Sequence, residues 1–434
     1  MAPLKVLIVG GGVAGPALAH WLSRIGANIT LIERFPRMRA TGQQVDLRGQ
    51  GVPMMHRMGI EAAVRAKTVK EKGTQLIDTA GRCRAFFAAA EGGTGKQSFT
   101  SEYEIMRGDL VGILNALTEG RANVRHLFDT TIDSFTQDEE SDPDGKVHVS
   151  FRDGSKEDYD LVVGADGTGS KTRRVMLGPD APDPRHRMGG YIGYYSIPSK
   201  PHDSDRGTFC HLPGPFHRAI GTRKDCPELT RVYMLMNAKG APAAIIDAAY
   251  KSGNLTELKK AWADLYQCDY WECDRFVDAL RHAPEADDFY CTPYEEVRLP
   301  EGSWSKGRVV LVGDAAHSGT ADGYGCTWGL VGPYLLAGEI AARLHGKEAL
   351  SPTEAVMRGA KKYEEIFRPI ATASQGGNKW FDMLSTPSSR LGIWSLHAVA
   401  RLAARLRLDQ MAGLGEEQAK WELPTYPELE EAQS

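Results

Sequence analysis

Residues 5–19 read Lys-Val-Leu-Ile-Val-Gly-Gly-Gly-Val-Ala-Gly-Pro-Ala-Leu-Ala. The apolar run Val6–Val9 predicts a short strand that is buried on both faces. It leads directly into Gly10-x-Gly12-x-x-Gly15 and then into small, helix-compatible residues. In such a turn the first glycine allows the tight bend, the second lets the backbone approach a pyrophosphate, and the third permits close packing of helix on strand. The N-terminus of the helix then favours an anion.

A second apolar run, Asn28–Ile32, ends in Glu33. This carboxylate lies about 20 residues beyond the glycines, where the acceptor for a ribose hydroxyl is expected. The alternative is a solvated carboxylate at the end of a strand. Because strand, glycine turn, helix and second strand occur together, we interpret the segment as a dinucleotide-binding unit. The glycines alone leave the identity of the dinucleotide open.

The chain has 434 residues, enough for two to three domains. Its charged fraction of 25% and apolar fraction of 42% are those of a globular protein. A net charge of −4 without a basic stripe argues against a nucleic-acid partner. Seven scattered cysteines suit reduced thiols, and the closest pair, Cys268 and Cys273, has no matching second pair for a zinc site.

The first residues lack the pattern of a signal peptide, and the uncharged run 323–338 is too short and glycine-rich to span a membrane. We therefore expect a cytoplasmic protein without integral membrane association. The segment Ile393–Leu408 carries Arg401, Arg405 and Arg407 and has two interpretations. It is either a helix packed across the domains, which we favour, or a helix that touches a membrane surface.

Two further buried strands each run into a glycine turn. The first turn is Gly164-Ala-Asp-Gly-Thr-Gly-Ser-Lys-Thr-Arg173, and the second is Gly313-Asp-Ala-Ala-His317 followed by Gly323-Tyr-Gly-Cys-Thr327. An Arg-x-Asp-Leu sequence occupies residues 107–110. Together with the first motif, in this order and spacing, these segments resemble the flavoprotein monooxygenases of the p-hydroxybenzoate hydroxylase class, including the branch that inactivates tetracyclines. The resemblance covers roughly residues 4–370.

The resemblance implies an α/β fold with a Rossmann-like FAD-binding domain, a mainly antiparallel β domain for the substrate, and C-terminal helices. Frequent prolines and aromatic residues in the middle of the chain agree with a separate β domain, with at least one helix near residues 255–265. The expected divisions are 1–75, 101–180 and 296–370 for the FAD-binding domain, 76–100 and 181–295 for the substrate domain, and 371–434 for the C-terminal helical segment.

The resemblance also implies which residues bind FAD. Glu33 would bind the adenosine ribose, Asp314 the ribityl or pyrophosphate region, and the N–H groups of Cys326 and Thr327 the pyrimidine edge of the flavin. Asp166 and Gly167 are also expected near NADPH. The full set of expected cofactor contacts is Gly10, Gly12, Ala14, Gly15, Glu33, Arg34, Asp46, Arg107, Asp166, Gly167, Asp314, Gly325, Cys326 and Thr327. No metal site and no catalytic side chain are assigned.

The activity implied is hydroxylation in secondary metabolism. NADPH, or NADH, would reduce FAD, molecular oxygen would form a flavin hydroperoxide, and one oxygen atom would pass to an electron-rich phenolic or polyketide-like small molecule. The protein would be a monomer or homodimer. Tyr194 and Arg218 are the candidate substrate residues, and the alternative makes them a core tyrosine and a surface arginine. His317 is interpreted as a packed histidine rather than a proton shuttle.

One segment departs from the family pattern. The loop Ser318–Asp322 has no proline and is one residue shorter than usual, and it would line the reacting edge of the flavin. An oxidase or dehydrogenase without oxygen transfer is therefore one alternative. A non-catalytic, lipid-carrying regulator of the same fold is another. A flavin halogenase is disfavoured because the chain has no Trp-x-Trp-x-Ile-Pro sequence.

Overall fold

The structure is a computed structural model. It describes residues 3–38, 42–69, 71–89, 102–224, 226–237, 240–319, 323–346, 349–373, 375–376, 386–408 and 421–430.

The three strands expected before the glycine turns are neighbours in one six-stranded sheet. Its strands pair in parallel except for the antiparallel edge strand β17. Short apolar runs buried on both faces are typical of such sheets. In spatial order the strands are β17 (Ser305–Lys306), β18 (Val309–Leu311), β11 (Leu161–Gly164), β1 (Lys5–Val9), β2 (Asn28–Ile32) and β7 (Val124–Leu127).

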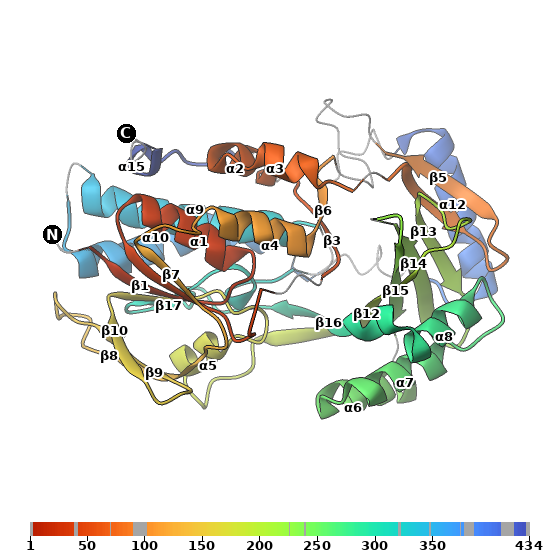
Figure 1. Cartoon of the computed structure of the whole chain (residues 1–434), viewed down its shortest axis with the longest axis horizontal. Helices are drawn as coiled ribbons and strands as arrows, with labels where there is room; N and C mark the ends of the chain where they lie inside the picture. The colour runs from red at the N-terminus through yellow and green to blue at the C-terminus, as the bar shows by residue number, and fades with distance from the viewer. Residues whose placement is uncertain are drawn as a thin grey trace.

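Two layers cover this sheet. Helices lie on one side, and the antiparallel strands β8 to β10 with the short helix α5 lie on the other (Figure 1). The α/β, Rossmann-like prediction is thereby confirmed. The elements of these layers are α1 (Ala14–Arg24), α4 (Arg107–Ala116), α9 (Gly325–His345), α10 (Pro352–Ala371), β8 (Ile132–Gln137), β9 (Val147–Phe151), β10 (Lys156–Tyr159) and α5 (Lys171–Leu177).

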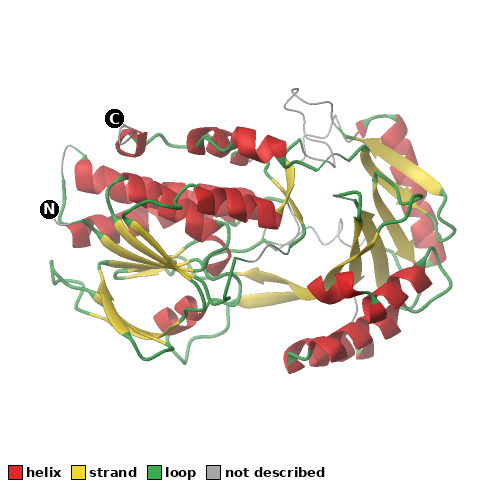
Figure 2. Ribbon diagram, in the orientation of Figure 1, coloured by secondary structure: helices red, strands yellow, loops and turns green. Residues whose placement is uncertain are grey.

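A second sheet of seven strands forms the other half of the molecule (Figure 2). Its strands are antiparallel except where β13 pairs with β4. In spatial order they are β16 (Tyr290–Val297), β12 (Arg185–Pro198), β15 (Leu229–Asn237), β14 (His217–Arg223), β13 (Gly207–Leu212), β4 (Gly73–Ile77) and β5 (Cys83–Ala88). The boundary expected at residue 75 therefore falls inside β4.

Helices pack on one face of the seven-stranded sheet. Alternate residues of β15, Val232, Met234 and Met236, are buried against them, whereas Tyr233 and Leu235 point to the opposite face and are only half-buried. We call that opposite face the open face. The sequence led us to expect at least one helix near residues 255–265, and α7 (Leu255–Tyr266) is that helix. Two more helices lie beside it in the sequence, α6 (Ala241–Ser252) and α8 (Cys273–His282).

Short elements connect the two halves. The strands β3 and β6 pair with each other and lie between the sheets in the view of Figure 1. A 3-10 turn, η1, precedes β16. The bounds of the short elements are β3 (Gln44–Asp46), α2 (Gly51–Met58), α3 (Glu61–Ala66), β6 (Glu104–Met106), η1 (Pro284–Asp288) and η2 (Gly313–Ala315).

Residues 421–430, which include the short helix α15 (Pro427–Glu430), form a clasp across helices of the first half. The carbonyl of Leu429 accepts a hydrogen bond of 2.7 Å from Nε of Arg24, at the end of α1. The carbonyl of Pro424 accepts hydrogen bonds from Arg57 on α2 at 2.7 Å and from Tyr334 on α9 at 2.9 Å. Three helices from distant parts of the sequence are thus joined by one late segment.

The helix expected within 393–408 is α12 (Arg390–Arg405), which lies against β5 at the outer end of the second half (Figure 1). Its residue Ala400 packs with Ala85 and Phe87. None of the helices in the described part of the chain combines the length and the apolar character needed to cross a membrane.

Two Glu–Arg pairs on α10 provide a test of this packing. The Glu364 carboxylate is 6% exposed, pairs with Arg368, and accepts hydrogen bonds from the backbone N–H groups of Gly302 at 2.8 Å and Trp304 at 2.9 Å. Glu364→Ala would leave these buried donors unsatisfied, so we expect it to lower the free energy of unfolding by about 2–4 kcal/mol in denaturant titrations.

The matched control is Glu354→Ala, which removes the same i,i+4 pairing with Arg358 from a carboxylate that is 46% exposed. Solvent screens this pair, so its loss should change the free energy of unfolding by no more than about 0.5 kcal/mol. Equal effects of the two substitutions would contradict the assignment of Glu364 as an anchor.

Candidate functional site

The three glycine turns meet at the carboxyl ends of β1, β11 and β18. Gly10 has φ +118°, and a Cβ atom there would overlap the carbonyl group of Ala165 in the second turn. A Cβ atom on Gly313, in the third turn, would lie 3.1 Å from Cβ of Ala14. The buried Arg173 donates a hydrogen bond of 2.8 Å to the carbonyl of Ala315. The sheet order therefore assembles the motifs into one site.

The start of α1 suits an anion. A Cβ atom on Gly15 would collide with the carbonyl oxygen of Gly10, so helix and turn pack closely only with glycine at this position. A Cβ atom on Gly12, in contrast, would meet just Nη2 of Arg107, at 3.4 Å. No described side chain caps α1, and its first turn has no acidic residue. Its first N–H groups and the cation of Arg107 thus border an accessible position.

Glu33 lies beside this turn. Its Oε2 accepts a hydrogen bond from the N–H of Gly11 at 2.8 Å, and its Oε1 accepts one from the N–H of Phe35 at 3.1 Å. The carboxylate is therefore fixed at the end of β2, next to the first glycines. Arg34 is exposed, with its guanidinium 4.9 Å from the ring centre of Phe35.

A second group of polar residues joins β3 to the start of α9. Asp46 and Arg48 form an ion pair of 2.6 Å. The hydroxyl of Thr327 accepts a hydrogen bond from the N–H of Arg48 at 3.1 Å and donates one to its carbonyl at 3.0 Å. Oδ1 of Asp46 and Nε of Arg48 are buried without a hydrogen-bond partner among the described residues. These orphaned atoms mark a position where a polar ligand would complete the bonding.

Charged groups surround Cys326, in the first turn of α9. Burial raises the pKa of its thiol to about 12, the nearby guanidinium of Arg107 opposes this rise, and the carboxylates of Asp314 and Asp46 add to it. These residues therefore lie within electrostatic range of one another. No described side chain caps α9, which begins at Gly325. Arg107, Asp314 and Asp46 thus lie near the start of α9, and Arg107 also lies beside Gly12 at the start of α1.

Asp166 has a structural role that the sequence did not indicate. Its carboxylate accepts hydrogen bonds from the backbone N–H groups of Lys171 at 2.8 Å and Thr172 at 3.0 Å, and so caps α5. Its Cα lies near Gly10, and the adjacent Gly167 turns with φ +78°. The backbone of this motif therefore borders the site, while the Asp166 side chain is occupied by the helix.

These features fit FAD. The close glycine turn and the two uncapped helix N-termini suit a pyrophosphate. The fixed Glu33 carboxylate suits a ribose hydroxyl, and the buried, unpartnered atoms of Asp46 and Arg48 suit a polar cofactor that reaches toward α9.

A row of tyrosines lies on the open face of the seven-stranded sheet. The strand register places Tyr290, Tyr194 and Tyr233 next to one another on β16, β12 and β15. The rings of Tyr194 and Tyr290 stack with centroids 4.8 Å apart, and Tyr233 meets Tyr194 edge-on at 5.2 Å. The hydroxyl of Tyr290 donates a hydrogen bond to the side-chain oxygen of Gln43. The backbone carbonyl of Gln43 in turn accepts a hydrogen bond of 3.0 Å from the N–H of Arg107. The tyrosines thus connect to the cofactor side.

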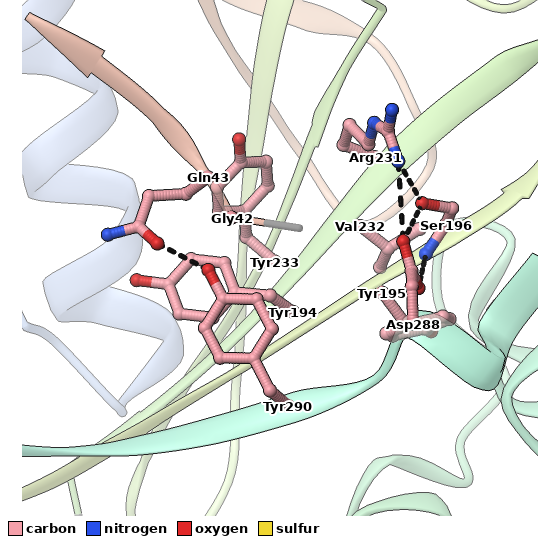
Figure 3. A pocket seen from close by; sticks show the side chains of 10 residues that line it. All are labelled: Gly42, Gln43, Tyr194, Tyr195, Ser196, Arg231, Val232, Tyr233, Asp288 and Tyr290. Atoms are coloured by element: carbon pink, nitrogen blue, oxygen red, sulfur yellow. Dashed lines mark hydrogen bonds and ion pairs between the residues drawn. The ribbon is translucent and has the colours of Figure 1, made fainter. Parts of the chain in front are cut away.

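These tyrosines line a pocket together with a polar group (Figure 3). Arg231 lies 3.3 Å from Asp288, which also accepts a hydrogen bond of 2.9 Å from the N–H of Ser196. The aromatic side and the polar side therefore face one pocket. Tyr233, Tyr290 and Arg231 were not identified from the sequence, although period-2 alternation along their strands is the pattern that places them on the open face.

Arg218 does not lie on the same face of the sheet as Tyr194. This corrects the expectation that Arg218 is a substrate residue. It pairs with Met236 on the face packed by helices, donates to the carbonyl of Leu265, and lies 5.9 Å from the ring centre of Tyr266. Arg223, five residues further along β14, is the arginine on the open face. It forms an ion pair with Glu104 of β6 and so ties the two halves together.

His317 is packed, as expected. Its ring lies 4.8 Å from that of Trp304 and 5.2 Å from that of Phe367. Burial lowers its pKa to about 3, so the ring is neutral at physiological pH. The loop that follows is anchored at Ser318, whose hydroxyl accepts a hydrogen bond of 2.9 Å from the N–H of Val297. The rest of the proline-free loop, residues 320–322, lies outside the described residues.

Comparison with known proteins agrees with a flavin-binding protein. A family model described as FAD binding domain matches residues 3–182. The chain is 41% identical to a flavin-dependent monooxygenase of a Phoma species over 432 residues, which cover 98% of each protein. It is 39% identical over 446 residues to an FAD-dependent monooxygenase of Sarocladium schorii, with 99% of each covered.

Solved structures show the same architecture. A tetracycline destructase superposes with a TM-score of 0.74 at 25% identity, and the match covers 98% of this chain and 99% of the other. The assembled glycine turns, the family model and the full-length relatives lead to one conclusion. The chain belongs to the flavin-dependent monooxygenases and is an FAD-dependent enzyme.

Proposed function

We propose that the enzyme uses NAD(P)H and molecular oxygen to hydroxylate an electron-rich aromatic or enolic small molecule, such as a phenol or polyketide. The observation that carries this proposal is the pocket in Figure 3. Stacked tyrosines and Arg231 line it together with Gln43, whose backbone carbonyl accepts a hydrogen bond from the N–H of Arg107. The tetracycline named for the destructase relatives is a flat ring system of the same kind.

In this proposal the two helix N-termini contact FAD at two places, α1 at the pyrophosphate and α9 at the flavin ring. Gly10, Gly12, Ala14 and Gly15 surround the pyrophosphate, with Arg107 adding positive charge. Glu33 binds the adenosine ribose, and Arg34 lies beside it at the surface. Asp46 and Asp314 bind polar groups further along the cofactor. The backbones of Asp166 and Gly167 border it, and the N–H groups of Gly325, Cys326 and Thr327 face the flavin ring.

FAD, when bound and reduced by NAD(P)H, would supply the chemistry of oxygen activation and transfer. The residues of this chain bind the cofactor, orient the substrate and shield the site from water. The N-terminus of α9 places positive potential where the reduced ring carries negative charge. The seven-stranded sheet covers the site and limits access of water. This division of labour is also our proposal for the domains. Residues 1–72, 101–180 and 296–370 bind the cofactor, and residues 73–100 and 181–295, which include the whole of β4, bind the substrate.

The substrate would lie against the tyrosine row. An aromatic ring of the substrate would meet the exposed edges of this row, because Tyr194 already stacks on Tyr290 and meets Tyr233 edge-on. Burial, reinforced by the nearby Tyr290 and Tyr294, holds the pKa of Tyr194 well above its ordinary value. Its hydroxyl is therefore protonated at neutral pH and can donate a hydrogen bond. Arg231 provides positive charge for a phenolate, enolate or carboxylate oxygen.

Isotope labelling tests the reaction class. Turnover under heavy-isotope oxygen, with candidate phenols and polyketides chosen by their stimulation of NAD(P)H oxidation, should place one labelled atom in the organic product. A coupled substrate that turns over without label would support the runner-up, an oxidase or dehydrogenase, which the proline-free Ser318–Asp322 loop favours. Peroxide measured in parallel separates coupled from uncoupled reduction of oxygen.

The substitution Gly12→Val tests the cofactor site. A side chain at this position has room in the protein, but it would occupy the place assigned to the pyrophosphate. We expect the purified variant to fold and to lose flavin, with FAD affinity reduced by at least about 100-fold, since two or more charged hydrogen bonds are disturbed. Flavin absorbance per protein after desalting, and titration with FAD, provide the measurement.

The matched control is Gly112→Val on α4, where an added Cβ atom meets no neighbouring atom within 4 Å. This variant should keep its flavin. Full flavin occupancy in the Gly12→Val protein would contradict the placement of the pyrophosphate.

The two faces of the sheet give a second paired test. Arg231→Met should raise the KM for an acidic substrate by about 10- to 100-fold while flavin content is unchanged, since one charged hydrogen bond is lost. Arg218→Met, on the helix-packed face, should leave KM within about twofold of the wild-type value, since it touches no part of the pocket. Initial rates of substrate-stimulated NAD(P)H oxidation measure both, and the reverse ranking would remove Arg231 from the substrate site.

A further inference from the structure

Helix α12 has two apolar faces, of which one is packed. Its inner face places Ala400, Ala403 and Ala404 against Ala85 and Phe87 of β5. Nε of Arg401 donates a hydrogen bond of 3.1 Å to the carbonyl of Arg84. Just before the helix, the carbonyl of Ser388 accepts one of 2.9 Å from the N–H of Gly214, in the turn between β13 and β14. The helix is therefore held in a fixed orientation on the sheet.

The outer face of α12 is exposed and apolar. Leu391 is 73% exposed, Trp394 and Val399 are each 67% exposed, and Leu402 is 58% exposed. At 100° per residue, these positions and Leu406 fall within an arc of about 140°, so they form one continuous stripe. We call it the α12 stripe. Of the ten exposed large hydrophobic residues in the described part of the chain, six lie between 391 and 408. Such a concentration marks an interaction surface.

The charge of this helix is opposite to that of the whole protein. Residues 386–408 contain four arginines and no aspartate or glutamate, whereas the whole chain has a net charge of −4. By the same helical geometry, Arg390 and Arg401 lie along the border of the stripe at Trp394, and Arg405 lies just inside that border. All three arginines are exposed. The surface therefore combines an apolar centre with a cationic border.

We propose that the α12 stripe binds the surface of a membrane that contains anionic lipids, with the helix parallel to the bilayer. An apolar stripe bordered by arginines, with a tryptophan at the boundary, is the composition of interfacial helices. The 16 residues of α12 extend about 24 Å, enough to lie along a surface. The apolar side chains enter the boundary between headgroups and acyl chains, and the arginines contact lipid phosphates.

Charge selects this occupant over a second copy of the chain. In a symmetric dimer through the stripe, arginines of one helix would face arginines of the other, because the segment offers no carboxylate to pair with them. An anionic bilayer instead supplies both the apolar phase and the counter-charge. The site is also independent of catalysis, because no residue of α12 belongs to the proposed cofactor or substrate contacts.

Flotation of the FAD-loaded enzyme with lipid vesicles tests the proposal. Vesicles of phosphatidylcholine with phosphatidylserine should bind the protein at least about tenfold more tightly than vesicles of phosphatidylcholine alone, and binding should weaken as salt is raised. The double substitution Trp394→Glu and Leu402→Glu should abolish flotation and leave flavin content unchanged. Arg390→Glu and Arg405→Glu together should reduce binding to anionic vesicles and remove its salt dependence.

The matched control is the double substitution Ile245→Glu and Leu255→Glu, at exposed apolar residues on α6 and α7 with 50% and 45% exposure. This protein should float as the wild type does. Absence of flotation by the wild type, equal binding to neutral and anionic vesicles, or unchanged binding by the stripe variant would each overturn the proposal. So would a concentration-dependent dimer that the stripe substitutions dissociate, since the occupant would then be a second copy.

Discussion

The close approach of three backbone turns is the constraint on which the active site depends. Parallel strands bring the turns after Val9, Gly164 and Val312 to one edge of a sheet, but they meet only because Gly10 and Gly15 have no side chains to separate them. The N-termini of α1 and α9 then face a common space. Arg107, Asp46 and Asp314 reach that space from elements far apart in the sequence, so the cofactor contacts depend on the packing of the whole sheet.

The second sheet contributes its open face to the same site. Its packed face carries the hydrophobic core with α7 and α8, which leaves the other face free for polar and aromatic side chains. The Arg223–Glu104 ion pair and the Tyr290–Gln43 hydrogen bond fix this open face against β6 and the loop before β3. Because both ties involve buried or half-buried groups, relative movement of the two halves would leave the Arg223 and Glu104 charges unpaired and the Tyr290–Gln43 hydrogen bond unmade. The geometry of the pocket is therefore coupled to the position of the cofactor residues.

Local patterns predicted the elements that build the cofactor site. The strand ends and the glycine turns follow from short-range sequence signals, and the structure has each of them. Side-chain direction was harder to predict. Arg218 and Arg223 are both plausible anion ligands by composition, and only the strand register shows that they point to opposite faces. Asp166 reads as a site residue, but its carboxylate caps α5. The tyrosine row joins β12, β15 and β16, whose pairing no local pattern specifies.

The clasp formed by residues 421–430 has a consequence for biosynthesis. It secures α1, α2 and α9, and yet it leaves the ribosome after both sheets have been translated. At roughly 5–20 residues per second, about 20–80 s pass between the synthesis of α1 and that of the clasp. The surfaces of Tyr334 and Gly338 that Tyr426 later covers are open to solvent and to chaperones for about 5–18 s of that interval, because α9 is translated roughly 90 residues before Tyr426. Expression conditions that slow translation or limit chaperones should therefore affect the yield of this enzyme more than its stability once complete.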